Sequence, residues 1–283
     1  MMPLVFSGKF SLRQLEHKAN EIREDIIRAL LEAKSGHSAG PLGMADIFTA
    51  LYFDVLRVDP KHPNWPERDR VVLSNAHICP VLYATLAQRG FCSRKKFLTS
   101  LRKLGSPFQG HSNNHFKMGI ETCGGPLGQG LSQAVGMALA GRLDAASWRV
   151  YALLSDGEMD EGQTWEAVMF AGKERLRNLT AIVDRNNIQI DGFTEQIMPL
   201  EPLADKWRAF NWHVIEVDGH HIPHVIDALK EAQTIYEKPT VIIAHTIPGK
   251  GVSFMERKFE WHGKPPNVEE ARLALHELRQ HSP

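Results

Sequence analysis

Polar side chains that could bind a metal follow two apolar runs of the chain. The run YALL is followed by Ser155 and then Asp156-Gly157, and the next run, TAIV, ends in Asp184 and Asn186. A helical pattern lies between them, so both strands should be parallel and end at one edge of a sheet. Carboxylate and amide oxygens suit Mg²⁺, which often also binds phosphate. Capping of turns and of the next helix is the alternative that the residues alone leave open.

The segments that would position these side chains alternate as in a parallel sheet. Strands are expected at 149–154, 180–184, 213–217 and 240–245 and in RVVLSNAH, and helices at about 19–31, 44–56, 80–88, 131–146, 163–176, 222–236 and from 268. This pattern predicts one α/β domain over residues 1–283, with a doubly wound, mostly parallel sheet flanked by helices. Ligands of such sheets bind outside the carboxyl ends of the strands.

Composition excludes several classes of function. The formal net charge is zero, so no overall field attracts nucleic acid or an anionic membrane. The three cysteines form no CxxC pair, which argues against a disulfide framework or a zinc site. No apolar run approaches the ~18 residues of a membrane span. We expect a soluble, cytoplasmic protein with no nucleic-acid or membrane partner.

The motifs around these strand ends resemble a known family. SDG followed by NN is similar to the GDG…N motif that binds thiamine diphosphate, and the longer forms SDGEMDEG and VDRNNIQIDG resemble those of transketolases. Further matching segments occur in family order from Ser35 to Pro265: SGHSAGPLG, DRVVLSNAH, LGSPFQGH, GGPLGQGLSQAVGMA, and TIPGKGVSFME with WHGKPP. The fold implied is the diphosphate-binding domain of thiamine-diphosphate enzymes. Ser155 replaces the usual first glycine, and SGHSAG lacks a proline of the family's turn; neither change removes a chemical group.

The resemblance implies two cofactors, thiamine diphosphate and Mg²⁺, with Ca²⁺ or Mn²⁺ as possible replacements. The metal ligands would be Asp156, Asn186 and the backbone carbonyl of Ile188. The residues implied to contact the cofactor are His77, Gly125, Leu127, Asp156, Gly157, Asn186 and His262.

The resemblance also implies five catalytic residues: His37, His111, His262, Glu161 and Glu166. His262 and His37 would handle protons at the acceptor's aldehyde oxygen, and His111 would bind the donor's terminal hydroxyl. The two glutamates would couple two cofactor sites across a subunit interface. Without the resemblance, each histidine could equally be a capping or core residue, and Glu161 could simply favour a helix N-terminus.

The chain is shorter than a complete transketolase, which is more than twice this length. The pyrimidine-binding and C-terminal domains would be absent, and with them the glutamate that activates the cofactor. The resemblance therefore implies the N-terminal subunit of a split transketolase. Its partner in an α2β2 heterotetramer would be a C-terminal transketolase subunit. The reaction would be transfer of a two-carbon ketol unit from a ketose phosphate to an aldose phosphate. A fragment of a full-length enzyme is the alternative.

Two other functions remain open at the level of sequence. A decarboxylating thiamine-diphosphate enzyme, of the deoxyxylulose-phosphate synthase or 2-oxo-acid dehydrogenase type, shares the same domain. A binding subunit that has lost catalysis would keep the fold alone. The four histidines 37, 77, 111 and 262 favour sugar chemistry over the 2-oxo-acid dehydrogenase type. They also favour an active enzyme over a subunit that has lost catalysis.

Overall fold

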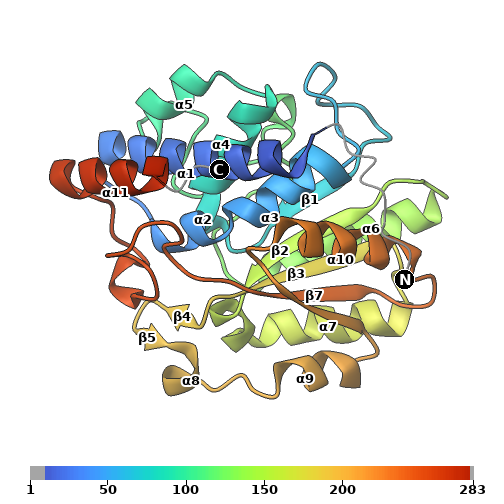
Figure 1. Ribbon diagram of the computed structural model, residues 1–283. Helices are drawn as coiled ribbons and strands as arrows, with labels where there is room; N and C mark the ends of the chain where they lie inside the picture. Colours follow the sequence, from blue (N-terminus) through green and yellow to red (C-terminus); the bar gives the residue numbers. More distant parts are fainter. Residues whose placement is uncertain (1–9, 281–283) are drawn as a thin grey trace.

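The centre of the molecule is a five-stranded parallel sheet with the order β1-β2-β3-β7-β6 (Figure 1). A computed structural model describes residues 10–280 of the chain. The strands are β1 (Arg70–Leu73), β2 (Val150–Ser155), β3 (Leu179–Arg185), β6 (His213–Asp218) and β7 (Thr240–His245). A separate antiparallel hairpin, β4 (Ile188–Gln189) with β5 (Gly192–Phe193), follows β3.

Helices connect these strands and cover the sheet. They are α1 (Leu12–Ala33), α2 (Ala39–Gly43), α3 (Ala45–Ala50), α4 (Cys79–Arg89), α5 (Arg94–Ser100), α6 (Gln129–Leu143), α7 (Gly162–Glu174), α8 (Thr194–Ile197), α9 (Leu203–Ala209), α10 (Ile222–Thr234) and α11 (Val268–Gln280). Single 3-10 turns occupy Ala76–Ile78, Phe116–Met118, Gly157–Asp160 and Phe259–Trp261. No helix within residues 10–280 is long and apolar enough to cross a membrane.

The sheet is buried on both faces, and alternate residues of each strand point to opposite faces. In β2, Tyr151 and Leu153 join the core beneath α1, α3, α4 and α10, whereas Ala152 and Leu154 join the core beneath α6, α7 and α9. The prediction of a doubly wound parallel sheet flanked by helices is therefore confirmed.

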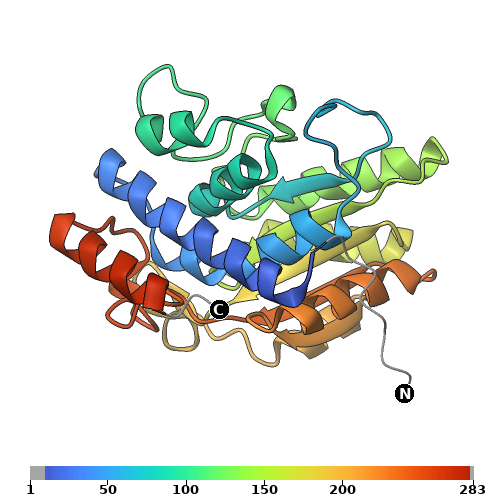
Figure 2. The same ribbon diagram turned by 45° about the horizontal axis from the view of Figure 1, so that its top comes forward.

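Helix α1 leads the chain to the carboxyl edge of the sheet. It begins with a capping box between Ser11 and Gln14 and ends at Lys34, which has the left-handed conformation common at helix C-termini. Helix α11 lies along α1, as Figures 1 and 2 both show, and Asn20 Nδ2 donates to the Leu278 carbonyl at 2.9 Å.

The region after β3 differs most from the expectation drawn from the sequence. The hairpin β4–β5 and the helices α8 and α9 were not predicted, because they are too short to show a helical or strand period. The expected helix 44–56 is instead α3 followed by a π-helical turn, Leu51–Val55. The hairpin and the loop after β7 both lie at the left of Figure 1, where the strands end.

Candidate active site

Three histidines from distant parts of the sequence form one cluster at the carboxyl edge of the sheet. His37 follows α1, His77 lies in the turn after β1, and His262 lies in the loop after β7. Their ring centroids are 5.0 Å apart for His37 and His77, 5.5 Å for His37 and His262, and 5.1 Å for His77 and His262. The structure thus brings these three predicted site residues together.

Hydrogen bonds to the backbone hold the loop of His262 against the loop of His37. Ser38 Oγ donates to the carbonyl of Lys264 at 2.6 Å, and Gly249 N donates to the carbonyl of Ala39 at 2.8 Å. At the base of the same loop, Ile247 N donates to His220 Nε2 at 2.7 Å. The histidine cluster is therefore positioned by its loops, without hydrogen bonds between the rings among the residues described.

The environment of the cluster favours neutral imidazoles. Burial, followed by the charges that His262, Arg102 and His111 carry when protonated, lowers the pKa of His37 to about 4. Burial and the neighbouring histidines hold the pKa of His77 well below its usual value, and burial lowers the pKa of His262. At neutral pH all three rings therefore carry an unprotonated nitrogen that can accept a hydrogen bond.

Several polar atoms beside this cluster are buried without a protein partner. His37 Nδ1 and both amide atoms of Asn75 have no hydrogen bond within the described part of the chain, and the Asn75 side chain is fully buried. Asn75 lies two residues before His77 at the end of β1. Because buried polar groups in proteins are nearly always hydrogen-bonded, a ligand bound here would supply the partners that these atoms lack.

His111 lies on a loop that is anchored to α4. Cys79 Sγ donates to the Gly110 carbonyl at 3.3 Å, and Tyr83 Oη donates to the Gln109 carbonyl at 3.1 Å. A Cβ atom at Gly110 would be 2.6 Å from Arg102 Cζ, so glycine leaves room for this guanidinium. Burial and Arg102 both lower the pKa of His111. His111 is exposed and makes no ring contact with the cluster within the described residues.

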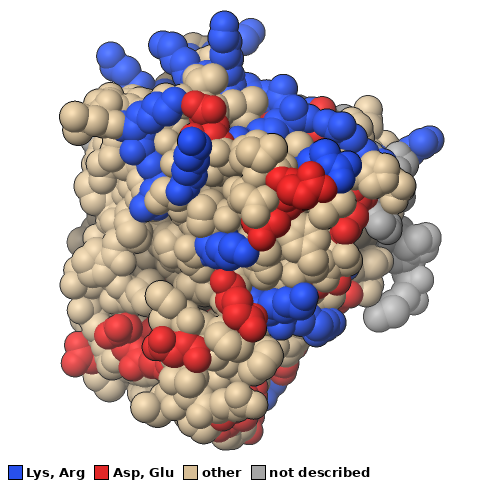
Figure 3. All heavy atoms as spheres, turned by 90° about the vertical axis from the view of Figure 1, so that its left-hand side faces the viewer, with Lys and Arg blue, Asp and Glu red and all other residues tan. Residues whose placement is uncertain are grey.

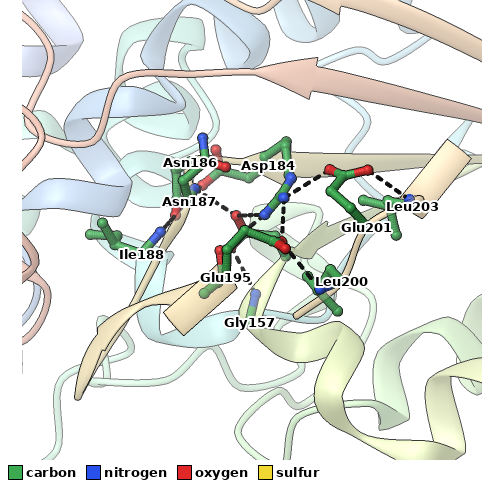
Figure 4. Close-up of polar contacts among 12 residues, drawn as sticks. Gly157, Asp184, Asn186, Asn187, Ile188, Glu195, Leu200, Glu201 and Leu203 are labelled. Carbon is green, nitrogen blue, oxygen red and sulfur yellow. Dashed lines mark hydrogen bonds and ion pairs between the residues drawn. The ribbon is translucent and has the colours of Figure 1, made fainter. Parts of the chain in front are cut away.

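Asp156 lies at the end of β2 and is fully buried. Its Oδ1 accepts from Gly157 N at 2.8 Å, and its Oδ2 accepts from Asn187 N at 2.6 Å and from Arg185 Nη1 at 3.1 Å; Gly157 and Asn187 are labelled in Figure 4. Burial raises the pKa of Asp156 to about 6, against the lowering effect of these donors. The contact with Asn187 joins the ends of β2 and β3, as the parallel arrangement predicts.

Asp184 on β3 and Asn186, the residue just after β3, continue this polar cluster. Asn186 Nδ2 donates to Asp184 Oδ2 at 2.8 Å, and Asn186 Oδ1 accepts from Ile188 N at 3.0 Å. Thr246 Oγ1, just after β7, donates to Asp184 Oδ1. Burial raises the pKa of Asp184 to about 7. The amide thus keeps its oxygen directed toward the turn that leads into the hairpin β4–β5.

The predicted metal donors are chemically suited to a hard divalent cation. They are one carboxylate oxygen, one amide oxygen and one main-chain carbonyl. A Cβ atom on Gly157 would lie 3.9 Å from the Ile188 carbonyl oxygen and 3.1 Å from Gln189 Cβ, so the hairpin passes close to the Asp156-Gly157 turn. No group of three or more His, Cys, Asp and Glu side chains within residues 10–280 could hold a metal.

The glycine-rich loop before α6 presents an open surface. Gly125 has φ of 148° and no atom within 4 Å of a built Cβ, whereas a Cβ on Gly124 would be 2.1 Å from Ala76 Cβ. Gly125 therefore combines a backbone conformation that favours glycine with free space in front of it. Leu127, in the same loop, is half-buried.

Glu158 fixes this loop and was not predicted as a site residue. Its fully buried carboxylate accepts from Gly128 N at 2.7 Å, from Ser155 N at 3.3 Å and from Ser74 Oγ. It thereby joins β1, β2 and the glycine-rich loop. Burial raises the pKa of Glu158 to about 7. In the sequence, only its position directly after the SDG motif indicated that Glu158 belongs to the site.

The two predicted glutamates, like His111, lie outside the cluster of three histidine rings. Glu161, at the N-terminus of α7, and Glu166, one turn further, are both exposed on this chain. Glu161 lies against the glycine-rich loop, since a Cβ on Gly128 would be 2.9 Å from Glu161 Cβ.

Charge is distributed unevenly over the face that carries the strand ends. Basic side chains gather in its upper part, over α5, and acidic side chains in its lower part, near α8 (Figure 3). Exposed basic residues of the upper part are Arg94, Lys95, Lys96, Arg102 and Lys103.

Comparison with known proteins identifies relatives over almost the whole chain. The family model "Transketolase, thiamine diphosphate binding domain" matches residues 15–280. The chain is 44% identical over 266 residues to the 6-deoxy-6-sulfo-D-fructose transketolase subunit of a Clostridium species, covering 94% of this chain and 96% of the relative. It is 40% identical to one of the apulose-4-phosphate transketolase subunits of Phocaeicola vulgatus, covering 94% of each.

Comparison with solved structures also identifies transketolases. The transketolase of Campylobacter jejuni superposes with a TM-score of 0.86 at 32% sequence identity, over 94% of this chain. This chain spans 43% of the length of that enzyme.

Proposed function

Because the chain belongs to the family of transketolase thiamine diphosphate binding domains and matches separate transketolase subunits over nearly their whole length, we propose that it catalyses ketol transfer together with a partner chain. The reaction moves a two-carbon ketol unit from a ketose to an aldose. The relatives named for sulfofructose and apulose-4-phosphate support substrates with an anionic group, a phosphate or a sulfonate.

One observation carries this proposal. Three neutral histidines, with ring centroids 5.0 to 5.5 Å apart, lie at the same sheet edge as Asp156 and Asn186. Sugar chemistry requires groups that bind hydroxyls and move protons, and diphosphate binding requires a site for a divalent metal. The two clusters supply both kinds of group side by side along the strand ends.

The residues fit thiamine diphosphate and Mg²⁺. Asp156, Asn186 and the carbonyl of Ile188 would hold the metal, and the backbone at Gly157 and the side chain of His77 would lie at the diphosphate. The unpartnered amide of Asn75 and the open face of Gly125 support a ligand between β1 and the glycine-rich loop. When bound, thiamine diphosphate supplies the stabilisation of negative charge that cleavage next to a ketone requires.

The histidines would handle the protons of the reaction. The neutral imidazoles of His37 and His262 can take the proton from the donor's hydroxyl that becomes an aldehyde oxygen. They can return a proton to the acceptor's aldehyde oxygen, which becomes a hydroxyl in the product. His111, at the exposed side of the cluster, would bind the donor's terminal hydroxyl. Placed histidines of this kind contribute ~10² to 10⁴ in rate.

Exposed apolar side chains at this edge support the presence of a second chain. Around the hairpin β4–β5 and α8, Ile190 is 65% exposed and Met198 is 56% exposed. Exposed apolar groups that lie together indicate an interaction surface. We place the C-terminal transketolase subunit here, where it would bring the pyrimidine-binding domain and the activating glutamate to the site.

A second interface would join two copies of this chain. On α7, Met169 is 54% exposed and Phe170 is 43% exposed, on the same helix as Glu166. Association through α7 would produce the proposed α2β2 heterotetramer and would bring Glu161 and Glu166 of the two copies near each other. We propose the cytoplasm as its location, where sugar phosphates occur and where the free thiols of Cys79, Cys92 and Cys123 would stay reduced.

The experiment that tests this function is an assay of the chain purified with its partner, with Mg²⁺ and thiamine diphosphate present. Mass spectrometry of the products would follow two carbons from a ketose phosphate or sulfonate to an aldose phosphate. Carbon dioxide release from pyruvate without ketol transfer would instead indicate a decarboxylating enzyme. A complex that binds cofactor but produces neither product would indicate a lapsed binding subunit.

A further inference from the structure

Arg185, the last residue of β3, is a buried cation at the candidate metal site. Its side chain is 4% exposed. Nη1 donates to Asp156 Oδ2 at 3.1 Å and to Thr194 Oγ1 at 3.0 Å. Nη2 donates to Glu195 Oε1 at 2.7 Å and Glu201 Oε1 at 2.9 Å, and both glutamates are labelled in Figure 4. One guanidinium thus joins a candidate metal ligand to the segment that follows the hairpin.

The contacts of Arg185 distinguish the two oxygens of Asp156. Oδ2 accepts two hydrogen bonds, from Arg185 and from Asn187 N, whereas Oδ1 accepts one, from Gly157 N. A carboxylate has about four lone-pair sites shared by its two oxygens. Oδ1 is therefore the oxygen with more capacity left for a cation, and Arg185 holds the carboxylate in the orientation that presents it.

The acidic partners of Arg185 in turn fix the backbone from α8 to α9. Glu195 Oε1 accepts from Leu200 N at 3.1 Å, and Glu201 Oε2 accepts from Leu203 N at 2.9 Å. The guanidinium carries one positive charge and its three carboxylate partners carry three negative charges, which leaves a net charge of 1 − 3 = −2. The surroundings thus stay attractive to a divalent cation although Arg185 is itself a cation.

We propose that Arg185 is a positioning residue for the metal, which orients Asp156 and ties it to the segment 194–203. The proposal rests on the proposed function, since it requires that Asp156 bind a divalent cation. Arg185 does not touch the metal; it acts through the carboxylate. Groups that orient a metal ligand in this way commonly contribute ~10- to 100-fold to metal affinity.

The test is a titration with Mn²⁺, followed by electron paramagnetic resonance, on the chain assembled with its partner and saturated with thiamine diphosphate. Arg185→Gln should weaken Mn²⁺ binding by ~10- to 100-fold. Arg185→Lys should be intermediate, because lysine keeps the charge but lacks the planar fork. Thr194→Val removes one acceptor of the guanidinium with little change of shape. It should weaken Mn²⁺ binding by a smaller factor than Arg185→Gln. It replaces Arg185→Gln as the test if that variant fails to fold.

The matched control is Arg68→Gln. Arg68 forms a buried ion pair with Glu121, its side chain is 7% exposed, and it lies just before β1 at the opposite edge of the sheet. A purely structural loss should lower the melting temperature of both variants, but only Arg185→Gln should change the Mn²⁺ affinity.

The two proposals fail in different ways. If the wild-type complex binds Mn²⁺ and Arg185→Gln and Thr194→Val bind it equally well, Arg185 has no positioning role and the proposed function stands. If the wild-type complex binds no Mn²⁺ in the presence of thiamine diphosphate, the metal site itself is wrong and both proposals fall.

Discussion

The half-buried histidine cluster and the buried acid cluster, formed by Asp156, Asp184 and Arg185, lie at the same sheet edge. They differ in how many of their polar atoms have hydrogen-bond partners. Asp156, Asp184 and Arg185 are each hydrogen-bonded to several protein partners. By contrast, His37 Nδ1 and the amide of Asn75 have none among the described residues.

This difference indicates which cluster depends more on a ligand. Unsatisfied buried polar atoms cost free energy that a ligand would recover, whereas the acid cluster is stabilised by its own network. We therefore expect the acid region to be ordered before the cofactor binds and the histidine region to gain most from binding.

The largest effect is expected from removing the carboxylate of the acid cluster. Asp156→Ala should abolish Mg²⁺-dependent binding of thiamine diphosphate, because the proposed metal site loses its only charged ligand. The measurement is the rise of melting temperature of the assembled complex on addition of cofactor and Mg²⁺. Asp191→Ala, an exposed acid in the nearby hairpin turn, is the control and should keep the full rise. An undiminished rise in Asp156→Ala would contradict the metal assignment.

In the histidine cluster, His262→Ala should reduce turnover while cofactor still binds. We expect kcat to fall by ~10² to 10⁴, the usual contribution of a placed acid or base. Steady-state kinetics of ketol transfer provide the measurement. His276→Ala, on the exposed face of α11, should leave kcat unchanged. Equal rates for His262→Ala and wild type would exclude His262 from proton transfer.

A substitution of Asn75 tests whether buried polar atoms beside the histidine cluster lack hydrogen-bond partners in the absence of the cofactor. Asn75→Leu should raise the free energy of unfolding of the cofactor-free protein by about 1 kcal/mol, because it removes an unpartnered buried amide. It should also weaken cofactor binding. Asn20→Leu is the matched control: its amide donates to the Leu278 carbonyl, so the same change should destabilise the protein. Denaturant unfolding measures the free energy of unfolding of both variants. Destabilisation by Asn75→Leu would show that the Asn75 amide has a hydrogen-bond partner in solution.

A further expected effect concerns pH. The pKa of His37 is lowered to about 4 by burial and by nearby cationic groups, whereas an unfolded histidine titrates near its usual value of about 6.5. Between these values the unfolded chain binds a proton that the native chain does not, so stability falls as pH decreases through this window. His37→Gln should flatten this fall. Denaturant unfolding at several pH values measures this dependence, and an unchanged slope would contradict a half-buried, neutral His37.

The strands of the central sheet were predictable from the sequence. The alternating apolar runs predicted all five strands of the parallel sheet, and parallel strands place their ends at one edge. The closeness of Asp156 to the turn after β3 followed directly, and Asp156 Oδ2 does accept from Asn187 N.

The contacts that depend on non-periodic loops were not predictable. Arg185 lies within the quoted motif, but its partners Thr194, Glu195 and Glu201 belong to a segment without regular period. Asn75 lies within the predicted strand segment RVVLSNAH, yet its lack of a hydrogen-bond partner depends on the three-dimensional packing around it. Sequence spacing predicts which edge a residue reaches, whereas the hydrogen-bond partners require the folded loops.

The measurement that tests the central claim most directly is native mass spectrometry of the protein purified from its own source with Mg²⁺ retained. The account predicts two copies of this chain, two copies of a second chain and two molecules of thiamine diphosphate in one assembly. A homo-oligomer of this chain alone, without thiamine diphosphate, would contradict it.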